Sequence, residues 1–183
     1  MSVRSVAGLL VAGCALMAAG PSAAGNEKPF FDRVVGNWTG PGEIVAGKYK
    51  GTKFVCTFAG ETAGKSAGMA LDGSCRVGLF SQKMRAEVRR KGDSFAGSFL
   101  DGAAGKGLDI VSGTIERDAM VVGLNRKQLK GAMVARLADK DSLNITVSVR
   151  VAEKLVPVIG MSLKRGEDTV TQTSLGTGFS LDD

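Results

Sequence analysis

The sequence predicts an all-β protein, a single antiparallel up-and-down β-barrel of eight to ten strands that follows a cleaved signal peptide. Apolar and polar residues alternate with a period of two along several segments, and short turns containing Gly or Asp separate them at intervals of roughly 8–12 residues. Helical periodicity is absent from the mature chain, except over Glu27–Val34. A closed barrel is favoured because closure removes exposed strand edges, and a two-sheet sandwich is the alternative.

Residues 1–24 have the features of a secretory signal peptide. Arg4 is the only charged residue before Glu27, an apolar run extends from Val6 to Gly20, and Pro21–Gly25 supplies a helix breaker followed by small residues. Signal peptidase accepts such an exit. The apolar run is shorter than the ~20 residues that a spanning helix needs. We therefore expect a periplasmic or secreted protein with no transmembrane segment in the mature chain.

An alternative signal lies inside the same apolar run. Val11-Ala12-Gly13-Cys14 resembles a lipobox, in which a cysteine after small residues is lipidated and becomes the new N-terminus. The alternative localisation is therefore a lipoprotein that is anchored through Cys14.

The mature chain is expected to form one barrel domain over residues 25–165 and an acidic flexible tail over residues 166–183. Lys83–Arg89 shows the clearest alternation of apolar and polar residues. Similar segments follow it, joined by short turns. We expect strands over residues 83–89, 94–100, 110–116, 119–124, 131–137 and 143–149. The glycine-containing stretches 60–68 and 101–107 are expected to be loops at the mouth of the barrel.

Basic residues outnumber acidic ones, with 24 Lys and Arg against 18 Asp and Glu. The expected tail carries four acids and no base, so the positive excess lies in the barrel domain. Such a surface attracts anionic partners, or is simply solvated. Few aromatic residues lie among the bases, and the chain has an export signal, so we expect no nucleic-acid partner.

Cys56 and Cys75 are the two cysteines of the expected mature chain. Two cysteines in an exported domain usually pair, because the compartment is oxidising. The chain-entropy model gives closure of this loop about 3 kcal/mol of stabilisation. With no His in the chain and only two thiols, we expect no metal site.

The segment from Phe30 to Gly40 contains the only Trp, within Gly36-Asn37-Trp38. A short apolar helical turn leading into Gly-x-Trp on the first strand resembles the start of lipocalins and their calycin relatives. In those families the Trp closes one end of the barrel, and a basic side chain from a late strand packs across it. The resemblance implies structural roles for Gly36 and Trp38, with Lys164 or Arg165 as the stacking cation.

Residues 36–43 are also similar to the opening of nitrobindin-type barrels, which bind haem through a histidine. This chain has no His, so that chemistry does not carry over and we expect no cofactor. A haem held by Tyr49, a Met or a Cys is the alternative that stays formally open.

The order of Trp38, Cys56 and Cys75 resembles that of periplasmic inhibitors of secreted metalloproteases. Those inhibitors are lipocalin-like barrels with one disulfide, and their N-terminal segment enters the protease cleft. The resemblance implies that Gly25–Phe31 would be the inhibitory segment.

Catalytic chemistry is not expected. The chain lacks a His that could act as a general base near neutral pH, a Gly-x-Ser-x-Gly nucleophile turn and a phosphate loop. Asp109 and Glu116 lie seven residues apart on one expected strand, a spacing that places them on opposite faces.

The sequence therefore predicts a non-enzymatic periplasmic barrel that binds a small apolar ligand or supports the cell envelope, through ligand-binding residues that it leaves unknown. A periplasmic protease inhibitor of the lipocalin-like type, with a protein partner, is the alternative function. A barrel of this size holds one small molecule or is filled by its own side chains, and the sequence leaves both open.

Overall fold

A computed structural model describes residues 27–64, 67–100 and 107–166, so the expected signal peptide and acidic tail lie outside the described residues. One short helix, α1 (Glu27–Val34), precedes ten strands. The strands are β1 (Gly36–Ile44), β2 (Lys53–Thr62), β3 (Gly68–Val77), β4 (Phe80–Lys91), β5 (Ser94–Leu100), β6 (Leu108–Glu116), β7 (Ala119–Arg126), β8 (Leu129–Leu137), β9 (Ser142–Val151) and β10 (Lys154–Arg165).

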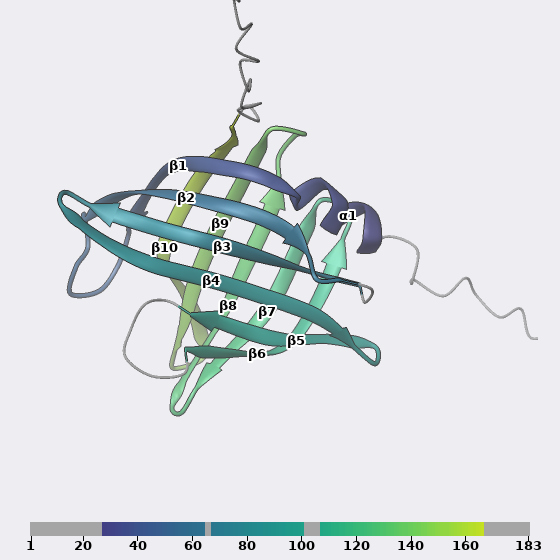
Figure 1. Ribbon diagram of the computed structural model, residues 1–183. Helices are drawn as coiled ribbons and strands as arrows, with labels where there is room; N and C mark the ends of the chain where they lie inside the picture. Colours follow the sequence, from purple (N-terminus) through teal and green to yellow (C-terminus); the bar gives the residue numbers. More distant parts are fainter. Residues whose placement is uncertain (1–26, 65–66, 101–106, 167–183) are drawn as a thin grey trace, which may run out of the picture.

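The ten strands form a closed barrel in which every strand pairs with its neighbour in the sequence and β1 pairs with β10 (Figure 1). All ten pairings are antiparallel, and Trp38 lies opposite Arg165 where the barrel closes. The prediction of an up-and-down β-barrel is confirmed, and the two-sheet sandwich is not the fold. No helix in the described part of the chain is long and apolar enough to cross a membrane.

Buried and exposed residues alternate along the strands, as the period of two predicts. The inward-facing residues form one apolar core, which includes Trp38, Phe58, Val88, Phe99 and Leu143. Glycine allows close strand contacts at places in this wall. A Cβ atom at Gly97 would lie 1.8 Å from the carbonyl oxygen of Glu87, a distance that no side chain tolerates.

Five hairpins are joined by two-residue turns, and the first residue of each turn has a positive φ. These residues are Gly78, Gly92, Arg117, Lys127 and Ala152. A positive φ at this position matches the right-handed twist of the flanking strands, and Gly adopts it most readily. Three of the five turns therefore place an ordinary L-residue in a conformation that favours glycine.

The two ends of the barrel differ. The closed end is the one that α1 covers, with Phe30, Phe31 and Val34 buried against the core (Figure 1). Because the strands run up and down, the β1–β2, β3–β4, β5–β6, β7–β8 and β9–β10 connections all leave the opposite end. We call this opposite end the open end and define it by residues 43–53, 76–83, 108–109, 126–130 and 150–154.

Candidate functional site

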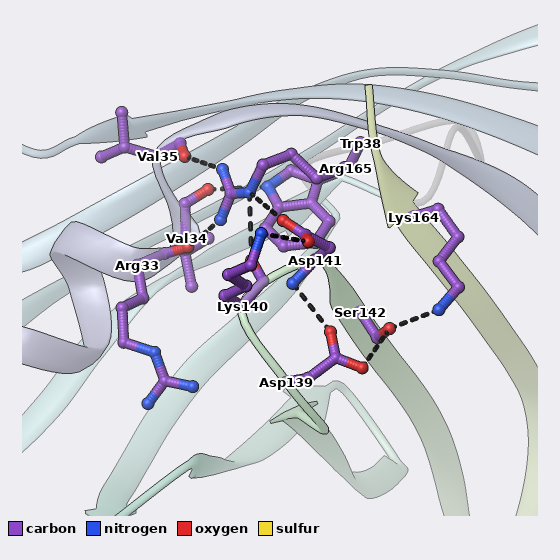
Figure 2. Close-up of polar contacts among 10 residues, drawn as sticks. All are labelled: Arg33, Val34, Val35, Trp38, Asp139, Lys140, Asp141, Ser142, Lys164 and Arg165. Atoms are coloured by element: carbon purple, nitrogen blue, oxygen red, sulfur yellow. Dashed lines mark hydrogen bonds and ion pairs between the residues drawn. The ribbon is translucent and has the colours of Figure 1, made fainter. Parts of the chain in front are cut away.

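Trp38 lies at the closed end of the barrel, between the helix and the core. Its side chain is fully buried, and the indole Nε1 donates a hydrogen bond to the carbonyl oxygen of Val34, at 2.8 Å. The guanidinium of Arg165 lies over the indole ring, 4.2 Å from the ring centroid (Figure 2). Trp38 therefore joins the end of α1 to the barrel, and Arg165 covers the ring.

Arg165 also donates hydrogen bonds to three backbone carbonyls. Nη1 bonds the oxygen of Val35, Nη2 bonds that of Arg33 at 2.6 Å, and Nε bonds that of Lys140 at 3.1 Å (Figure 2). The carbonyls of Arg33 and Val35 lie at the C-terminal end of α1, where carbonyls lack partners inside the helix and attract positive charge. This one side chain thus connects the helix, β10 and the β8–β9 turn.

Gly36 allows this arrangement. Its φ is +121°, and a Cβ atom there would lie 2.5 Å from Nη1 of Arg165. Lys164, the other candidate for the stacking cation, bonds the hydroxyl of Ser142 instead (Figure 2). Ser142 in turn donates to Asp139 at 2.8 Å, and this bond is the main cause of a lowered pKa at the Asp139 carboxyl. These contacts make the closed end a structural cap.

The interior of the barrel leaves little space for a ligand. An apolar cavity of about 20 Å³ is lined by side chains that include Phe58, Leu71, Met84, Met133 and Met161. That space has room for about one water molecule and lies far below the roughly 300–1,000 Å³ of a typical small-molecule site. The sequence left open whether the barrel holds a small molecule or is filled by its own side chains. Around this cavity, the barrel is filled by its own side chains.

The predicted disulfide between Cys56 and Cys75 is present. The two residues lie directly opposite each other on β2 and β3, with their Cα atoms 4.0 Å apart. Cys56 is fully buried, and its Sγ lies 3.7 Å from Sδ of Met161 on β10. The bridge is therefore part of the filled interior.

Exposed apolar side chains gather at the open end. Leu79 is 99% exposed and Phe80 is 83% exposed, both at the tip of the β3–β4 hairpin. Val77 lies opposite Phe80 across the same turn. The remaining large exposed apolar side chains of the open end are Val45, Tyr49, Leu129 and Val151. Adjacent large apolar side chains as exposed as Leu79 and Phe80 are typical of interaction sites.

Positive charge gathers at the same end. Among the described residues, the open end holds ten Lys and Arg against three acids, Glu43, Asp109 and Glu153. The other described parts of the chain hold eleven bases and ten acids. The ion pairs among described residues lie in those other parts, such as Arg33 with Asp118 and Arg85 with Asp72. Apart from Arg126, the bases of the open end have no acidic partner among the described residues.

The structure brings the sequence-predicted residues together in two groups, neither of which is at the open end. Gly36, Trp38 and Arg165 meet in the cap, and Cys56 pairs with Cys75 in the wall. The open end was not predicted as a site from the sequence, although the segment Val77-Gly78-Leu79-Phe80 carries a signal that indicates it. A hairpin turn with apolar residues where solvent-exposed turns are usually polar is unusual.

Two expectations about position are corrected. The strand ends that flank the stretches 60–68 and 101–107 lie at opposite ends of the barrel, because β2 and β3 meet at the closed end and β5 and β6 meet at the open end. Residues 65–66 and 101–106 themselves lie outside the described residues. Asp109 and Glu116 are both exposed on the outer face. The register of β6 shifts between Ile110 and Ser112, and this irregularity reverses the expected alternation.

Comparison with known proteins supports the fold. The structure of Rv2717c from M. tuberculosis is similar with a TM-score of 0.53 at 14% identity, over 73% of this chain and 93% of that one. A protein of unknown function from the DUF3598 family of Nostoc punctiforme matches with a TM-score of 0.48 at 13% identity, over 74% of this chain and 49% of that one. No protein-family model matches the sequence, and no curated protein does. The chain is thus a ten-stranded antiparallel barrel, similar in fold to Rv2717c.

Proposed function

We propose that the mature chain is a non-enzymatic barrel protein of the cell envelope that binds an envelope component through its open end. The observation that carries the proposal is the contrast between the two regions where a barrel could bind. The interior cavity measures about 20 Å³, whereas Leu79, Phe80 and several basic side chains are exposed at the open end. A filled barrel of this kind acts through its surface.

The absence of catalysis is part of the same proposal. The chain has no His, and the two described carboxylates with lowered pKa values, Glu87 and Asp139, lie away from the open end. Hydrogen bonds from Arg89 and Arg85 lower the pKa of Glu87, so this group serves an ion-pair network on the barrel wall. Neither carboxylate lines the interior cavity.

A small apolar ligand inside the barrel is the second candidate, and one observation favours it. Met84, Met133 and Met161 line the interior cavity, and flexible Met side chains can rearrange to make room. The resemblance to lipocalins, carried by Gly36, Trp38 and Arg165, points in the same direction. Such binding would require the filled interior to expand.

The protease-inhibitor alternative has less support. Its working segment is Gly25–Phe31, and the described part of it, from Glu27 to Phe31, would have to leave the barrel to enter a protease cleft. Phe30 and Phe31 are 1% and 2% exposed, and Phe31 contacts Phe95 edge to face. Extending the segment would expose both rings to water, at a cost of about 1.5–3 kcal/mol for each.

Cell fractionation with native mass spectrometry tests the proposal. We expect the full chain, expressed in its own host, to be processed near Gly25 and recovered with the envelope, at the mass of the polypeptide alone. Leu79→Ser with Phe80→Ser should reduce the envelope-bound share. Val111→Ser with Val121→Ser, which removes two exposed apolar side chains from the barrel wall, is the matched control. Unprocessed chain in the cytosol, or a stoichiometric small molecule in the barrel, would overturn the proposal.

A further inference from the structure

We infer that the open end docks on an anionic lipid surface, with the β3–β4 hairpin inserted among the acyl chains and the surrounding bases placed at the lipid phosphates. The inference rests on the proposed function and names the partner of the same surface. Two independent observations carry it: the position of the exposed apolar side chains and the distribution of charge.

The β3–β4 hairpin has the shape of a membrane anchor. Gly78 and Leu79 form the turn between β3 and β4. In Figure 1 this hairpin reaches the left edge of the barrel, as the β1–β2 connection does. Strand pairing continues to the last residues, with Val77 opposite Phe80, so the tip is held by the ladder. A preformed tip loses little conformational freedom on insertion. Leu79 and Phe80 are the most exposed large apolar side chains of the described residues.

Bases flank this apolar tip at a short distance along both strands. Arg76 precedes Val77 on β3, and Lys83 follows Phe80 on β4, with only the neutral Ser81 and Gln82 between them. Long basic side chains keep their charge at the headgroups while their stems cover apolar surface. An apolar tip with bases behind it therefore matches the order of layers in a bilayer, from acyl chain to phosphate.

The other connections of the open end repeat the pattern. Tyr49 is 63% exposed, and the ammonium of Lys48 lies over its ring, 5.4 Å from the centroid. Amphipathic aromatic rings and lysines are typical of the headgroup region. Leu129 lies between two bases, and Val151 follows another. The exposed bases of these connections are Lys50, Lys53, Lys127, Lys130, Arg150 and Lys154.

The same features disfavour two other partners. A second copy of the chain would bring two ends together that each hold ten bases and three acids, and the like charges would repel. A nucleic acid would leave Leu79 and the exposed Val and Leu side chains without an apolar contact, since recognition of single strands uses stacking aromatics along a basic groove. An acidic protein with an apolar surface is the rival that experiment must separate.

Vesicle co-sedimentation of the mature chain tests the inference. We expect binding to phosphatidylcholine vesicles that contain phosphatidylglycerol, little binding to phosphatidylcholine alone, and weaker binding as salt is added, because salt screens exposed charges. Leu79→Ser with Phe80→Ser should weaken binding by about tenfold or more, because it removes most of the apolar area that inserts. Val111→Ser with Val121→Ser should bind as the parent does.

A matched pair of single substitutions isolates the charge effect. Lys127 and Arg117 are both exposed and each begins a two-residue turn, with φ of 53° and 52°, but Lys127 lies at the open end and Arg117 at the closed end. Lys127→Gln should weaken binding by about fivefold, the effect of one base near an anionic surface. Arg117→Gln should leave binding unchanged. Thermal unfolding of each variant checks that the barrel is intact.

The outcomes separate the inference from the proposed function. Absence of binding to the anionic vesicles, or equal binding by the Leu79 and Phe80 double variant, overturns the lipid surface as partner. If vesicle binding fails in this way but the Leu79 and Phe80 double variant still has a smaller envelope-bound share than the parent, the proposed function stands and the partner is an acidic protein. If the chain is found unprocessed in the cytosol, the proposed function fails, whatever the vesicles show.

Discussion

Arg165 shows how one side chain fixes several elements of this barrel. Its guanidinium stacks on Trp38 and donates to the carbonyls of Arg33, Val35 and Lys140. A lysine could supply the positive charge, but it lacks the planar guanidinium, whose N–H groups donate in several fixed directions. From the sequence alone, Lys164 and Arg165 are alternatives for the stacking cation, because their order does not say which side chain faces inward. The register that places Arg165 opposite Trp38 decides between them.

Replacing Trp38 with Ala should lower the free energy of unfolding by about 3–5 kcal/mol, as large aromatic truncations in cores do. The indole is fully buried, and its Nε1 bonds the end of α1, so the helix should loosen as well. Denaturant unfolding measures the loss. Tyr49→Ala, which truncates an exposed aromatic ring, is the control and should change stability little. A Trp38→Ala variant as stable as the parent would contradict the role of the cap.

Glu87 should contribute to stability in a pH-dependent way. Its pKa lies below the ordinary 4.5, first because of its bond with Arg89 and then because of its bond with Arg85. A lowered folded-state pKa stabilises the protein above pH 4.5, and this contribution is lost as the pH falls through the lowered value. The pairs are partly exposed, so Glu87→Gln should cost about 1 kcal/mol or less at neutral pH.

Urea unfolding of the parent and of Glu87→Gln across this pH range measures the difference. The two stabilities should converge in acid. Glu153→Gln, at an exposed turn residue with no ion pair among the described residues, is the control. A difference that grows as the pH falls would have the wrong sign for this account.

Strands with clear alternation were predictable, and irregular ones were less so. Lys83–Arg89 lies within β4, and the turn at Arg117 and Asp118 lies where it was expected. The early strands contain glycines that blur the period of two, so their bounds were not predicted. Irregularities such as the register shift after Pro157 leave no mark in the hydrophobic pattern, because they depend on pairing with the neighbouring strand.

At the scale of one hairpin, Ala152 is held at a φ of 50° in the β9–β10 turn. Replacing it with Gly removes the steric cost of that conformation, and the larger entropy of Gly in the unfolded chain offsets part of the gain. Ala152→Gly should therefore raise the free energy of unfolding by about 0.5–1 kcal/mol. Glu153→Gly, one residue later and without a positive φ, should lower it instead. Equal effects of the two substitutions would count against the turn geometry.

The disulfide links two strands that are already paired. Thiol titration of the unfolded mature protein should find no free thiol, since Cys56 and Cys75 are bridged. Replacing both with Ala should lower the free energy of unfolding by about 3 kcal/mol in the chain-entropy model. The reduced parent is the control, and it should lose a similar amount. Two free thiols in protein that was isolated without reductant would contradict the prediction.

At the scale of the molecule, the two ends of the barrel have separate tasks. The closed end is capped by α1, Trp38 and Arg165, whereas the open end combines exposed apolar tips with an excess of basic residues over acidic ones. Composition alone indicates that the barrel carries net positive charge, but it does not indicate that this charge gathers at one end. Which connections share an end follows only from the closed order of the strands, and for that reason the mouth loops were misplaced.

A fluorescence measurement tests the docking of the open end most directly. Phe80→Trp places a reporter at the tip of the β3–β4 hairpin, and Trp38 adds only a constant background because it is fully buried. Val111→Trp, on the exposed barrel wall, is the matched control. We expect vesicles containing phosphatidylglycerol to shift the emission of the Phe80→Trp reporter to shorter wavelength and to leave the emission of the Val111→Trp reporter unchanged. An unshifted Phe80→Trp reporter, or an equal shift at both positions, would contradict it.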